Sequence, residues 1–325
     1  MSERLNLSGF SNLFSLANLL SMQPLVSAII VTTWSAQDAV KCVQSLLTQT
    51  IAGDIEILVI DNHSEDDSIG TLRAHFPLRP DSAQPSLRLQ PAGKTSSGKQ
   101  GFGGQVDHHP QVRLLESNRN RGYGAGNNYA ARFANGEYLL IINPDNELEP
   151  AGLERMVRML REDPSIGILA PKLQFPDGRS RESARAFPTL LDVLIKRTFL
   201  QHIFRSRLRH YLQADAPDVP VRDTDWVVGA CLFFRKDFFD QLHGFDERFF
   251  LFFEDMDLCR RCRLAGKRVV FASSIVAQDR KQRLSGGGFF SLLLRRTGRI
   301  HIASALKYFW KWRRGMEGTP TVSLP

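Results

Sequence analysis

The stretch Val26-Ser27-Ala28-Ile29-Ile30-Val31-Thr32-Thr33 decides the fold class of this chain. It is an apolar run of strand length and is rich in β-branched residues, which is typical of a fully buried strand. A helical pattern follows at Ala36–Thr48, and a second strand pattern covers Glu56–Asp61. Strands that alternate with helices predict an α/β domain.

The same alternation continues to about residue 272. Further strands are predicted at Val112–Glu116, Tyr138–Ile142, Ile166–Pro171, Trp226–Phe234 and Val269–Ala272. Helices are predicted near Asn127–Ala134, from Pro150 to about Glu162, over Thr189–Leu212, and over Glu254–Ala265, where Gly266 closes the helix. We therefore predict one α/β domain over 25–279. It carries an inserted mobile loop at 78–111, where Pro, Gly, Ser, Gln and His replace the apolar periodicity.

The net charge is concentrated near the C-terminal end. The 325 residues include 42 Lys plus Arg and 34 Asp plus Glu, a net charge of +8, and 42% are hydrophobic, which excludes wholesale disorder. Ten of the basic residues and none of the acidic ones lie in 280–316. Because aromatic residues are interleaved with them, we predict that 280–325 is a basic amphipathic helical extension that associates with an anionic membrane surface. A basic helix packed on the protein body is the alternative.

Cysteine usage and apolar runs bear on the compartment. The four cysteines are too few and too scattered for a disulfide scaffold and suit a reducing cytoplasm. No run of about 18 apolar residues predicts a membrane-spanning helix. Residues 1–24 have helical apolar periodicity without a basic leader or cleavage site, so we expect an amphipathic segment that docks on the body, with docking on a membrane surface as the alternative. These features predict a cytoplasmic protein, peripheral on the inner face of the cytoplasmic membrane.

Three acidic motifs follow strands or loops, where α/β proteins place their ligand sites. They are Asp61-Asn62-His63-Ser64, Asn143-Pro144-Asp145-Asn146 and Glu254-Asp255-Met256-Asp257. The Asp61 carboxylate can accept hydrogen bonds from a base or a ribose, and Asp145 can ligate Mg²⁺ or Mn²⁺ together with a diphosphate. The third motif follows an aromatic run. A carboxylate in such surroundings tends to have a raised pKa, which suits a general base.

Each acidic motif also has a purely structural explanation. The first is a good Asx-turn, the second a good turn, and acids at the start of a helix stabilise it. On the third helix, Cys259-x-x-Cys262 fits a core stripe better than half of a zinc site, because no second cysteine pair follows.

A glycine segment, Asn118-Arg119-Asn120-Arg121-Gly122-Tyr123-Gly124-Ala125-Gly126-Asn127, follows a predicted strand and opens a helix. Main-chain amides and an arginine at a helix start can hold phosphate. The segment is not the dinucleotide fingerprint, because Asn127 occupies the place of the third glycine.

In this order, the motifs resemble the family-2 glycosyltransferases of the GT-A fold. The matching segments are Val26–Thr32, Val59–Asn62, Asn118–Asn128, Asn143–Asp145, Gly229–Leu232 and Gly244–Cys259. Each is weak evidence alone, but six in sequence are strong evidence. The resemblance implies a mixed, mainly parallel nucleotide-binding sheet flanked by helices. The subgroup it resembles is the bacterial rhamnosyltransferase-like enzymes that build cell-surface polysaccharide.

The resemblance also implies roles for individual residues. Those implied in nucleotide binding are Thr32, Asp61, Asn62, Arg121 and Gly122. Those implied in catalysis are Asp255 as the base and Glu254 in support, with Asp145 as the ligand of Mg²⁺ or Mn²⁺. Those implied near the diphosphate or the acceptor are Asp257, Gln278, Arg280 and Lys281. A later helix of the subgroup corresponds to the segment with His301, Ser304, Tyr308 and Phe309. Gln278 stands where the family usually has histidine, which removes a metal or diphosphate contact.

The implied reaction is inverting sugar transfer. The donor would be a dTDP- or UDP-linked sugar, with rhamnose as one candidate, and the acceptor a lipid-linked or nascent cell-surface glycan. An anionic membrane surface is the further expected partner, and nucleic acid is not.

Two other functions remain as alternatives. A sugar-phosphate nucleotidyltransferase should carry a glycine-rich Arg/Lys signature in its first turn, which Thr32-Thr33-Trp34-Ser35 lacks. A non-enzymatic basic protein that binds membranes or nucleic acid leaves the three acidic motifs unexplained.

Overall fold

The computed structural model describes residues 23–76, 111–217, 219–280 and 296–313. The strands are β1 (Val26–Thr32), β2 (Ile55–Asp61), β3 (Gln111–Glu116), β4 (Tyr138–Ile142), β5 (Asn146–Leu148), β6 (Ile166–Gln174), β7 (Ala184–Arg185), β8 (Val221–Asp223), β9 (Trp226–Val227), β10 (Cys231–Arg235) and β11 (Arg268–Asp279). The α-helices are α2 (Ala36–Leu47), α3 (Ser68–His75), α4 (Tyr123–Ala131), α5 (Gly152–Glu162), α6 (Leu190–Arg197), α7 (Arg205–Tyr211), α8 (Lys236–Gln241), α9 (Glu254–Leu264) and α11 (Arg296–Trp312), with 3-10 turns η1 (Ala52–Asp54) and η3 (Phe199–His202).

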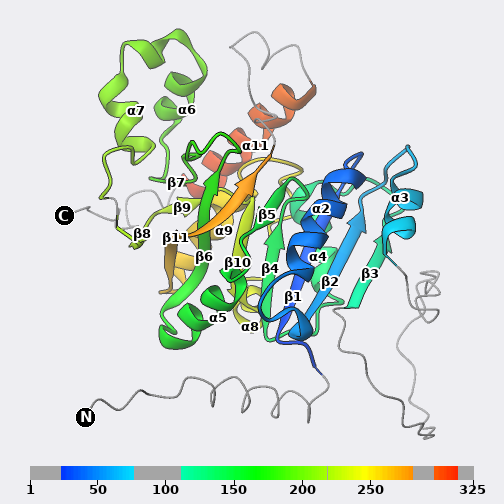
Figure 1. Cartoon of the computed structure of the whole chain (residues 1–325). Helices are drawn as coiled ribbons and strands as arrows, with labels where there is room; N and C mark the ends of the chain where they lie inside the picture. Colours follow the sequence, from blue (N-terminus) through cyan, green and yellow to red (C-terminus); the bar gives the residue numbers. More distant parts are fainter. Residues whose placement is uncertain (1–22, 77–110, 218, 281–295, 314–325) are drawn as a thin grey trace, which may run out of the picture.

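A mixed sheet of nine described strands forms the centre of the molecule (Figure 1). Its order is β3-β2-β1-β4-β10-β6-β11-β5, with β8 added against β11. The neighbours from β3 to β4 are parallel, as are β6 and β11. The pairs made by β10, β5 and β8 are antiparallel. The predicted mixed, mainly parallel α/β sheet is therefore confirmed.

The sheet divides the buried apolar side chains into two cores. Along β1, Val26, Ala28 and Ile30 belong to the core with α2 and α5, whereas Ile29 belongs to the core with α4, α9 and α11. This alternation follows from the two-residue repeat of a strand. Because helices cover both faces, the sequence of β1 is an unbroken apolar run rather than an alternating pattern.

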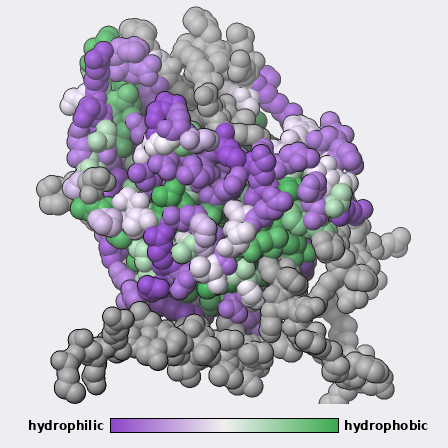
Figure 2. Space-filling view, viewed as in Figure 1, coloured by the Kyte–Doolittle hydropathy of each residue, from purple (hydrophilic) through white to green (hydrophobic). Residues whose placement is uncertain are grey.

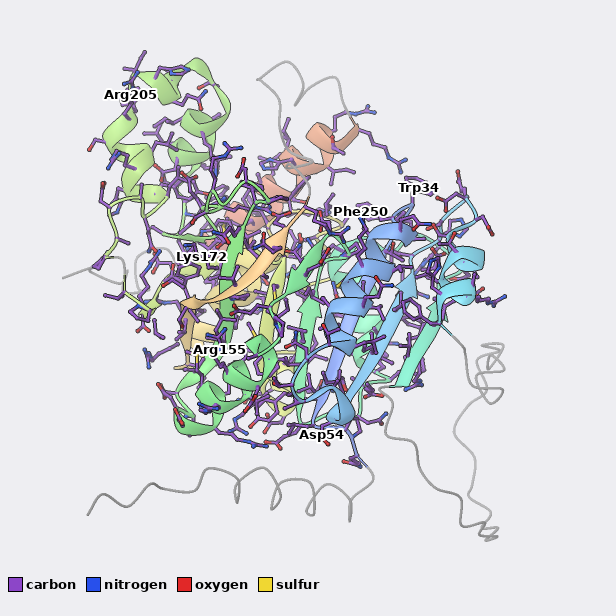
Figure 3. All side chains as sticks on the ribbon, viewed as in Figure 1. Trp34, Asp54, Arg155, Lys172, Arg205 and Phe250 are labelled. Atoms are coloured by element: carbon purple, nitrogen blue, oxygen red, sulfur yellow. The ribbon has the colours of Figure 1, made fainter. Side chains whose placement is uncertain are left out.

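The parallel strands end at one common edge of the sheet. Thr32, at the end of β1, is paired in register with Asp61, at the end of β2. Trp34 and Phe250 lie at this end of the molecule, and Asp54 lies at the opposite end (Figure 3). The loop that carries Phe250, directly before α9, therefore reaches the same edge as the ends of β1 and β2.

Most predicted elements lie within a few residues of their expected places, and Tyr138–Ile142 is β4 as predicted. The prediction of one strand over Trp226–Phe234 is wrong, because the chain leaves β9, which pairs with β7, before it enters β10 in the main sheet. The helix predicted over Thr189–Leu212 is three short helices, and the strand predicted at Val269–Ala272 is part of the twelve-residue β11.

The C-terminal helix α11 packs on the body of the protein. Its Tyr308 and Phe309 side chains are buried in the second core. For residues 296–312 of the predicted extension, the structure therefore agrees with the alternative prediction, a basic helix packed on the body. Within the described residues, no helix has the length and apolar character needed to cross a membrane. The predictions for residues 1–22, for the loop up to residue 110 and for Lys281 lie outside the described residues.

Candidate active site

The acidic motif of α9 begins directly after two residues with left-handed backbone. Phe252 and Phe253 have φ angles of 69° and 71°. Residues with a side chain avoid this region at a cost of about 1–2 kcal/mol each. Two such residues in succession therefore need support from the surrounding structure. Their turn starts the helix at Glu254 and so sets the position of the acidic pair.

Helix α11 supplies that support. The ring centroid of His301 lies 5.1 Å from that of Phe252 and 5.2 Å from that of Phe253. The buried Ser304 hydroxyl donates a hydrogen bond to the carbonyl oxygen of Leu251 at 2.9 Å. The C-terminal helix therefore holds the strained turn in front of the acidic pair, although about 50 residues separate the two in sequence.

Asp255 lies beside the break between β9 and β10. Its Oδ2 atom accepts a hydrogen bond from the main-chain amide of Gly229 at 2.9 Å, and its Oδ1 atom accepts one from the amide of Met256 at 2.8 Å. A Cβ atom at position 229 would lie 3.0 Å from the Cβ of Asp255, so glycine permits this close approach. At Gly229 the chain passes from the two-stranded sheet to the main sheet. This change of sheet places the Gly229 amide next to the Asp255 carboxylate.

Glu254 and Asp255 have unequal environments. Glu254 is 5% exposed, and its Oε2 atom has no hydrogen-bond partner among the described residues. Burial raises the pKa of Glu254 well above its usual range, and the charge of Asp255 raises it further. Burial also raises the pKa of Asp255, but the amides of Gly229 and Met256 and the charge of Arg185 oppose this rise. Main-chain donors stabilise the charged form of a carboxyl group, so the geometry favours Asp255 over Glu254 as the ionised member of the pair.

The glycine segment is joined to the same site through Tyr123. The Tyr123 amide donates to the carbonyl of Phe250 at 2.9 Å, and its hydroxyl donates to the carbonyl of Gly229. Gly122 has a φ of +81°, and a Cβ there would collide with the Phe250 carbonyl oxygen. Only glycine fits this position. The two hydrogen bonds of Tyr123 therefore connect the glycine segment to the Phe250 loop and to Gly229, where the chain changes sheets.

Asn62 and Arg121, both expected to bind the nucleotide, are engaged with protein neighbours. The Asn62 Oδ1 atom accepts from the Arg121 amide at 3.0 Å, and its Nδ2 atom donates to Oδ1 of Asn120 at 3.1 Å. The Arg121 Nε atom donates to the Ser117 hydroxyl at 3.0 Å, and its guanidinium lies over the Tyr129 ring. Asn62 therefore ties the end of β2 to the glycine segment.

Thr32 and Asp61 keep unused hydrogen-bonding capacity at the buried ends of β1 and β2. Oδ2 of Asp61 accepts from the amide of Ser64 at 3.0 Å. Oδ1 of Asp61 and Oγ1 of Thr32 are buried and have no partner among the described residues. Because buried polar atoms are nearly always hydrogen-bonded, these two oxygens are available to a polar ligand at the ends of β1 and β2.

Comparisons with known proteins find similarity to glycosyltransferases. The profile of the family described as Glycosyl transferase family 2 matches residues 97–242. Over 230 residues the chain is 28% identical to the N-acetylglucosaminyl-diphospho-decaprenol L-rhamnosyltransferase of Mycobacterium tuberculosis, which covers 67% of this chain and 75% of that protein. Over 202 residues it is 26% identical to the rhamnosyltransferase WbbL of Escherichia coli, covering 59% and 71% of the two chains. The chain is similar to the glycosyltransferases of family 2.

Two solved structures share the GT-A fold of this glycosyltransferase. One is S. aureus TarS 1-349 in complex with UDP, with a TM-score of 0.50 and 15% identity over 78% of this chain and 60% of that one. The other is GalNAc-T7 with UDP, GalNAc and Mn²⁺, with a TM-score of 0.52 and 14% identity over 82% and 45%. The chain thus spans 60% or less of the length of these two structures, and the likeness concerns the fold alone.

Asp145 of the glycosyltransferase lies between β4 and β5, next to the end of β11. Its carbonyl accepts from the Arg280 amide at 3.0 Å, and its Oδ1 atom accepts from the Asn146 side chain at 3.1 Å. The Arg280 guanidinium is ion-paired with Asp38 at 3.1 Å and with Glu147 at 2.7 Å. Among the residues that the structure describes, no three His, Cys, Asp or Glu side chains cluster as a metal site. Asp145 therefore fits a hard cation held mainly by the donor diphosphate, not one held by protein ligands alone.

Asp257, which was expected near the diphosphate or the acceptor, lies in the interface between α9 and α11. It is fully buried between α9 and α11. Its Oδ2 atom accepts from Arg261 at 2.8 Å, and its Oδ1 atom accepts from the Trp312 indole at 2.9 Å and lies 2.6 Å from Nζ of Lys311. Both oxygens are occupied, so Asp257 anchors the C-terminal helix. Gln278, on β11, donates to Gln174 at 3.2 Å.

The structure adds Gly229 and Tyr123 to the residues around the acidic pair. Both lie in sequence segments that match the family, but no pattern in the sequence connects either of them with Asp255. The similarity to glycosyltransferases also favours this function over the nucleotidyltransferase and the non-enzymatic alternatives.

Proposed function

We propose that this glycosyltransferase transfers rhamnose, with inversion, from a nucleoside-diphosphate sugar to a lipid-linked glycan acceptor. The unequal pair of Glu254 and Asp255 at the strand-end edge carries the proposal, because the amides of Gly229 and Met256 stabilise a carboxylate at Asp255 while Glu254 is buried without such donors. The names of the M. tuberculosis and E. coli relatives support rhamnose, and the first of them supports an acceptor built on a lipid diphosphate.

Asp255 would act as the base. Its carboxylate takes the proton of the acceptor hydroxyl while that oxygen attacks the anomeric carbon. The bond between the anomeric carbon and the diphosphate oxygen breaks on the opposite face, and the nucleoside diphosphate leaves with the bonding electron pair. Attack and departure on opposite faces invert the anomeric configuration. A neutral Glu254 would leave Asp255 as the single proton acceptor of the pair.

The donor would lie along the ends of β1 and β2. The buried oxygens of Thr32 and Asp61 that lack partners would contact the nucleoside, and the Gly122 backbone would lie close to the diphosphate. Asp145 would hold Mg²⁺ or Mn²⁺ together with the diphosphate, and the cation supplies positive charge that stabilises the leaving group. The presence of Mn²⁺ and UDP in the GalNAc-T7 structure supports this choice of cofactor.

A lipid-linked acceptor places the reaction at a membrane surface. We propose the inner face of the cytoplasmic membrane, where nucleotide sugars are made and where the four buried, unpaired cysteines are compatible with a reducing environment.

The test is a donor and acceptor screen. The full chain is incubated with Mn²⁺, with dTDP-rhamnose or UDP-sugars, and with a polyprenyl-diphosphate-linked N-acetylglucosamine. Released nucleoside diphosphate and the product are measured, and the anomeric configuration of the product is read by NMR. We expect turnover with dTDP-rhamnose and an inverted product. No release from any donor, or a retained configuration, would contradict the proposal.

A further inference from the structure

We propose that the helical excursion, defined as residues 189–212 with α6, η3 and α7, is the surface by which this protein docks on an anionic phospholipid bilayer. The inference rests on the proposed lipid-linked acceptor, since that substrate requires the enzyme to work at a membrane. It assigns the contact to a surface within the catalytic domain rather than to the C-terminal helix.

Exposed apolar side chains are concentrated on the helical excursion. Eleven large apolar side chains are exposed among the described residues, and five of them lie in this segment: Leu190, Leu191, Leu194, Ile203 and Phe204. The three leucines share one side of α6, whereas Asp192 and Ile195 are buried. In Figure 2, hydrophobic surface lies among hydrophilic surface on the part of the molecule where α6 and α7 project in Figure 1. Apolar patches of this kind mark interaction sites.

The charge of the helical excursion complements an anionic surface. It contains five basic residues, Lys196, Arg197, Arg205, Arg207 and Arg209, and one acidic residue, Asp192. Its net charge is therefore +4 in 24 residues, half of the +8 of the whole chain. Apolar side chains interleaved with arginine are typical of helices that lie in a lipid headgroup layer. A nucleic acid would use the positive charge but would leave the exposed leucines in water.

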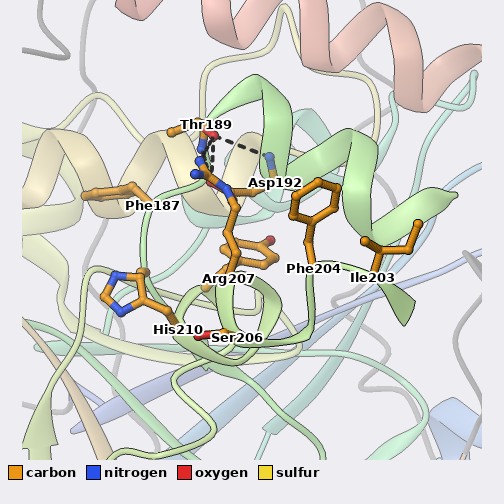
Figure 4. Close-up of a pocket in the computed structure, with 10 residues that line it drawn as sticks. Phe187, Thr189, Asp192, Ile203, Phe204, Ser206, Arg207 and His210 are labelled. Carbon is orange, nitrogen blue, oxygen red and sulfur yellow. Dashed lines mark hydrogen bonds and ion pairs between the residues drawn. The ribbon is translucent and has the colours of Figure 1, made fainter. Parts of the chain in front are cut away.

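Side-chain hydrogen bonds connect the two α-helices of the helical excursion. Nε of Arg207, on α7, donates to Oδ1 of Asp192, on α6, at 2.6 Å, and the Thr189 hydroxyl completes this link. The link lies at the wall of a cavity of about 780 Å³ that Phe204 and Tyr211 also line (Figure 4). The two helices therefore hold the apolar side chains in a fixed arrangement.

The position of the helical excursion suits a membrane-bound acceptor. Arg205, on α7, projects beyond the sheet at the end of the molecule where Phe250 and Trp34 lie (Figure 3). At its base, the Ala186 amide donates to the Tyr211 carbonyl at 3.0 Å, directly after β7. β7 carries Arg185, whose charge acts on Asp255. Docking through this surface would turn the catalytic edge toward the bilayer.

Helix α11 is less suited to this role, because two of its four cations bind the body of the protein and its apolar side chains Tyr308 and Phe309 are buried there. Nζ of Lys307 donates to the Arg248 carbonyl at 2.8 Å, and Nζ of Lys311 donates to Asp246 at 2.7 Å. Its large exposed apolar residues are Leu306 and Trp310. These two residues provide the matched control for the experiment.

The experiment is co-sedimentation of the full chain with vesicles, without donor or acceptor. Vesicles of about 3:1 phosphatidylcholine to phosphatidylglycerol are compared with pure phosphatidylcholine. The test variants are Leu190→Ser/Leu194→Ser/Ile203→Ser and Arg205→Glu, and the control is Leu306→Ser/Trp310→Ser. All substituted side chains are exposed, so we expect each variant to fold. Circular dichroism and thermal unfolding check this.

We expect the wild type and the control to bind the anionic vesicles, and both test variants to bind about tenfold or more weakly. Equal binding of the triple variant and the wild type would overturn the proposal, as would loss of binding in the control alone. A wild-type dimer that the triple variant dissociates would assign the surface to a second copy instead. On a soluble short-chain acceptor, the triple variant should retain wild-type turnover. If the wild type binds vesicles but turns over no acceptor, the proposed function fails while the docking surface stands.

Discussion

The main-chain amide of Gly229 donates a hydrogen bond to Oδ2 of Asp255 at 2.9 Å. This contact connects the switch between two sheets to the proposed catalytic base. It also requires a glycine, because a Cβ at position 229 would lie 3.0 Å from the Asp255 Cβ and 3.4 Å from its Oδ2 atom.

We therefore expect Gly229→Ala to displace the carboxylate. The kcat should fall by about 10- to 100-fold, as for other small misplacements of a catalytic group. Gly53→Ala is the control, because no atom lies within 4 Å of a Cβ there. Steady-state kinetics check the effect, and unchanged kcat in Gly229→Ala would show that the amide does not position the base.

Substitution of Gly122 tests whether its close contact with the Phe250 carbonyl contributes to stability. Gly122 and Gly178 have similar left-handed φ angles, +81° and +84°, but only a Cβ at position 122 meets the Phe250 carbonyl. Gly178→Ala should cost about 1–2 kcal/mol of backbone strain. Gly122→Ala should lower the free energy of unfolding by about 1–3 kcal/mol more, through overpacking. Urea denaturation of both variants checks the difference, and equal losses would remove the Phe250 contact from the account.

The raised pKa of Glu254 makes stability depend on pH. Because the folded-state pKa lies above the ordinary 4.5, the neutral carboxyl stabilises the folded protein at low pH, and this contribution is lost as pH rises through the folded-state pKa. Glu254→Gln should therefore show a smaller fall in unfolding free energy above pH 4.5 than the wild type. Parallel unfolding curves over pH check this. An identical pH dependence in the two proteins would mean that Glu254 is charged in the folded state.

Asp257 should matter for stability rather than for substrate binding. Its carboxylate holds Arg261, Lys311 and Trp312 in a buried interface. Asp257→Asn removes that charge and should lower the free energy of unfolding by about 1–3 kcal/mol while the donor KM stays unchanged. Asp240→Asn, in an exposed pair with Lys236, is the control and should change stability by less than about 1 kcal/mol. A raised donor KM with normal stability would return Asp257 to the diphosphate site.

The central strands could be predicted from sequence because burial on both faces leaves a direct signature. The apolar run at Val26–Thr32 required a buried strand, and the polar residues at its end and after Glu56–Asp61 marked the ligand edge. The switch at Gly229 could not be predicted in this way. The stretch Trp226–Phe234 is largely apolar throughout, so its periodicity does not distinguish one strand from two strands in different sheets.

The conformation that starts α9 also depends on distant residues. The left-handed backbone of Phe252 and Phe253 is held by His301 and by Ser304, which lie in a different part of the sequence. Similarly, the three acids of the motif look equivalent in sequence. Only the packing of α11 separates Asp257, as an anchor, from Asp255.

The most direct test of the account is the turnover of Asp255→Asn. This variant keeps the shape of the side chain and the oxygen that accepts from Gly229, but it removes the basic carboxylate. We expect kcat for sugar transfer to fall by about 100- to 10,000-fold, with the donor still raising the thermal unfolding temperature as it does for the wild type. Turnover within about threefold of the wild type would contradict the assignment of Asp255 as the base.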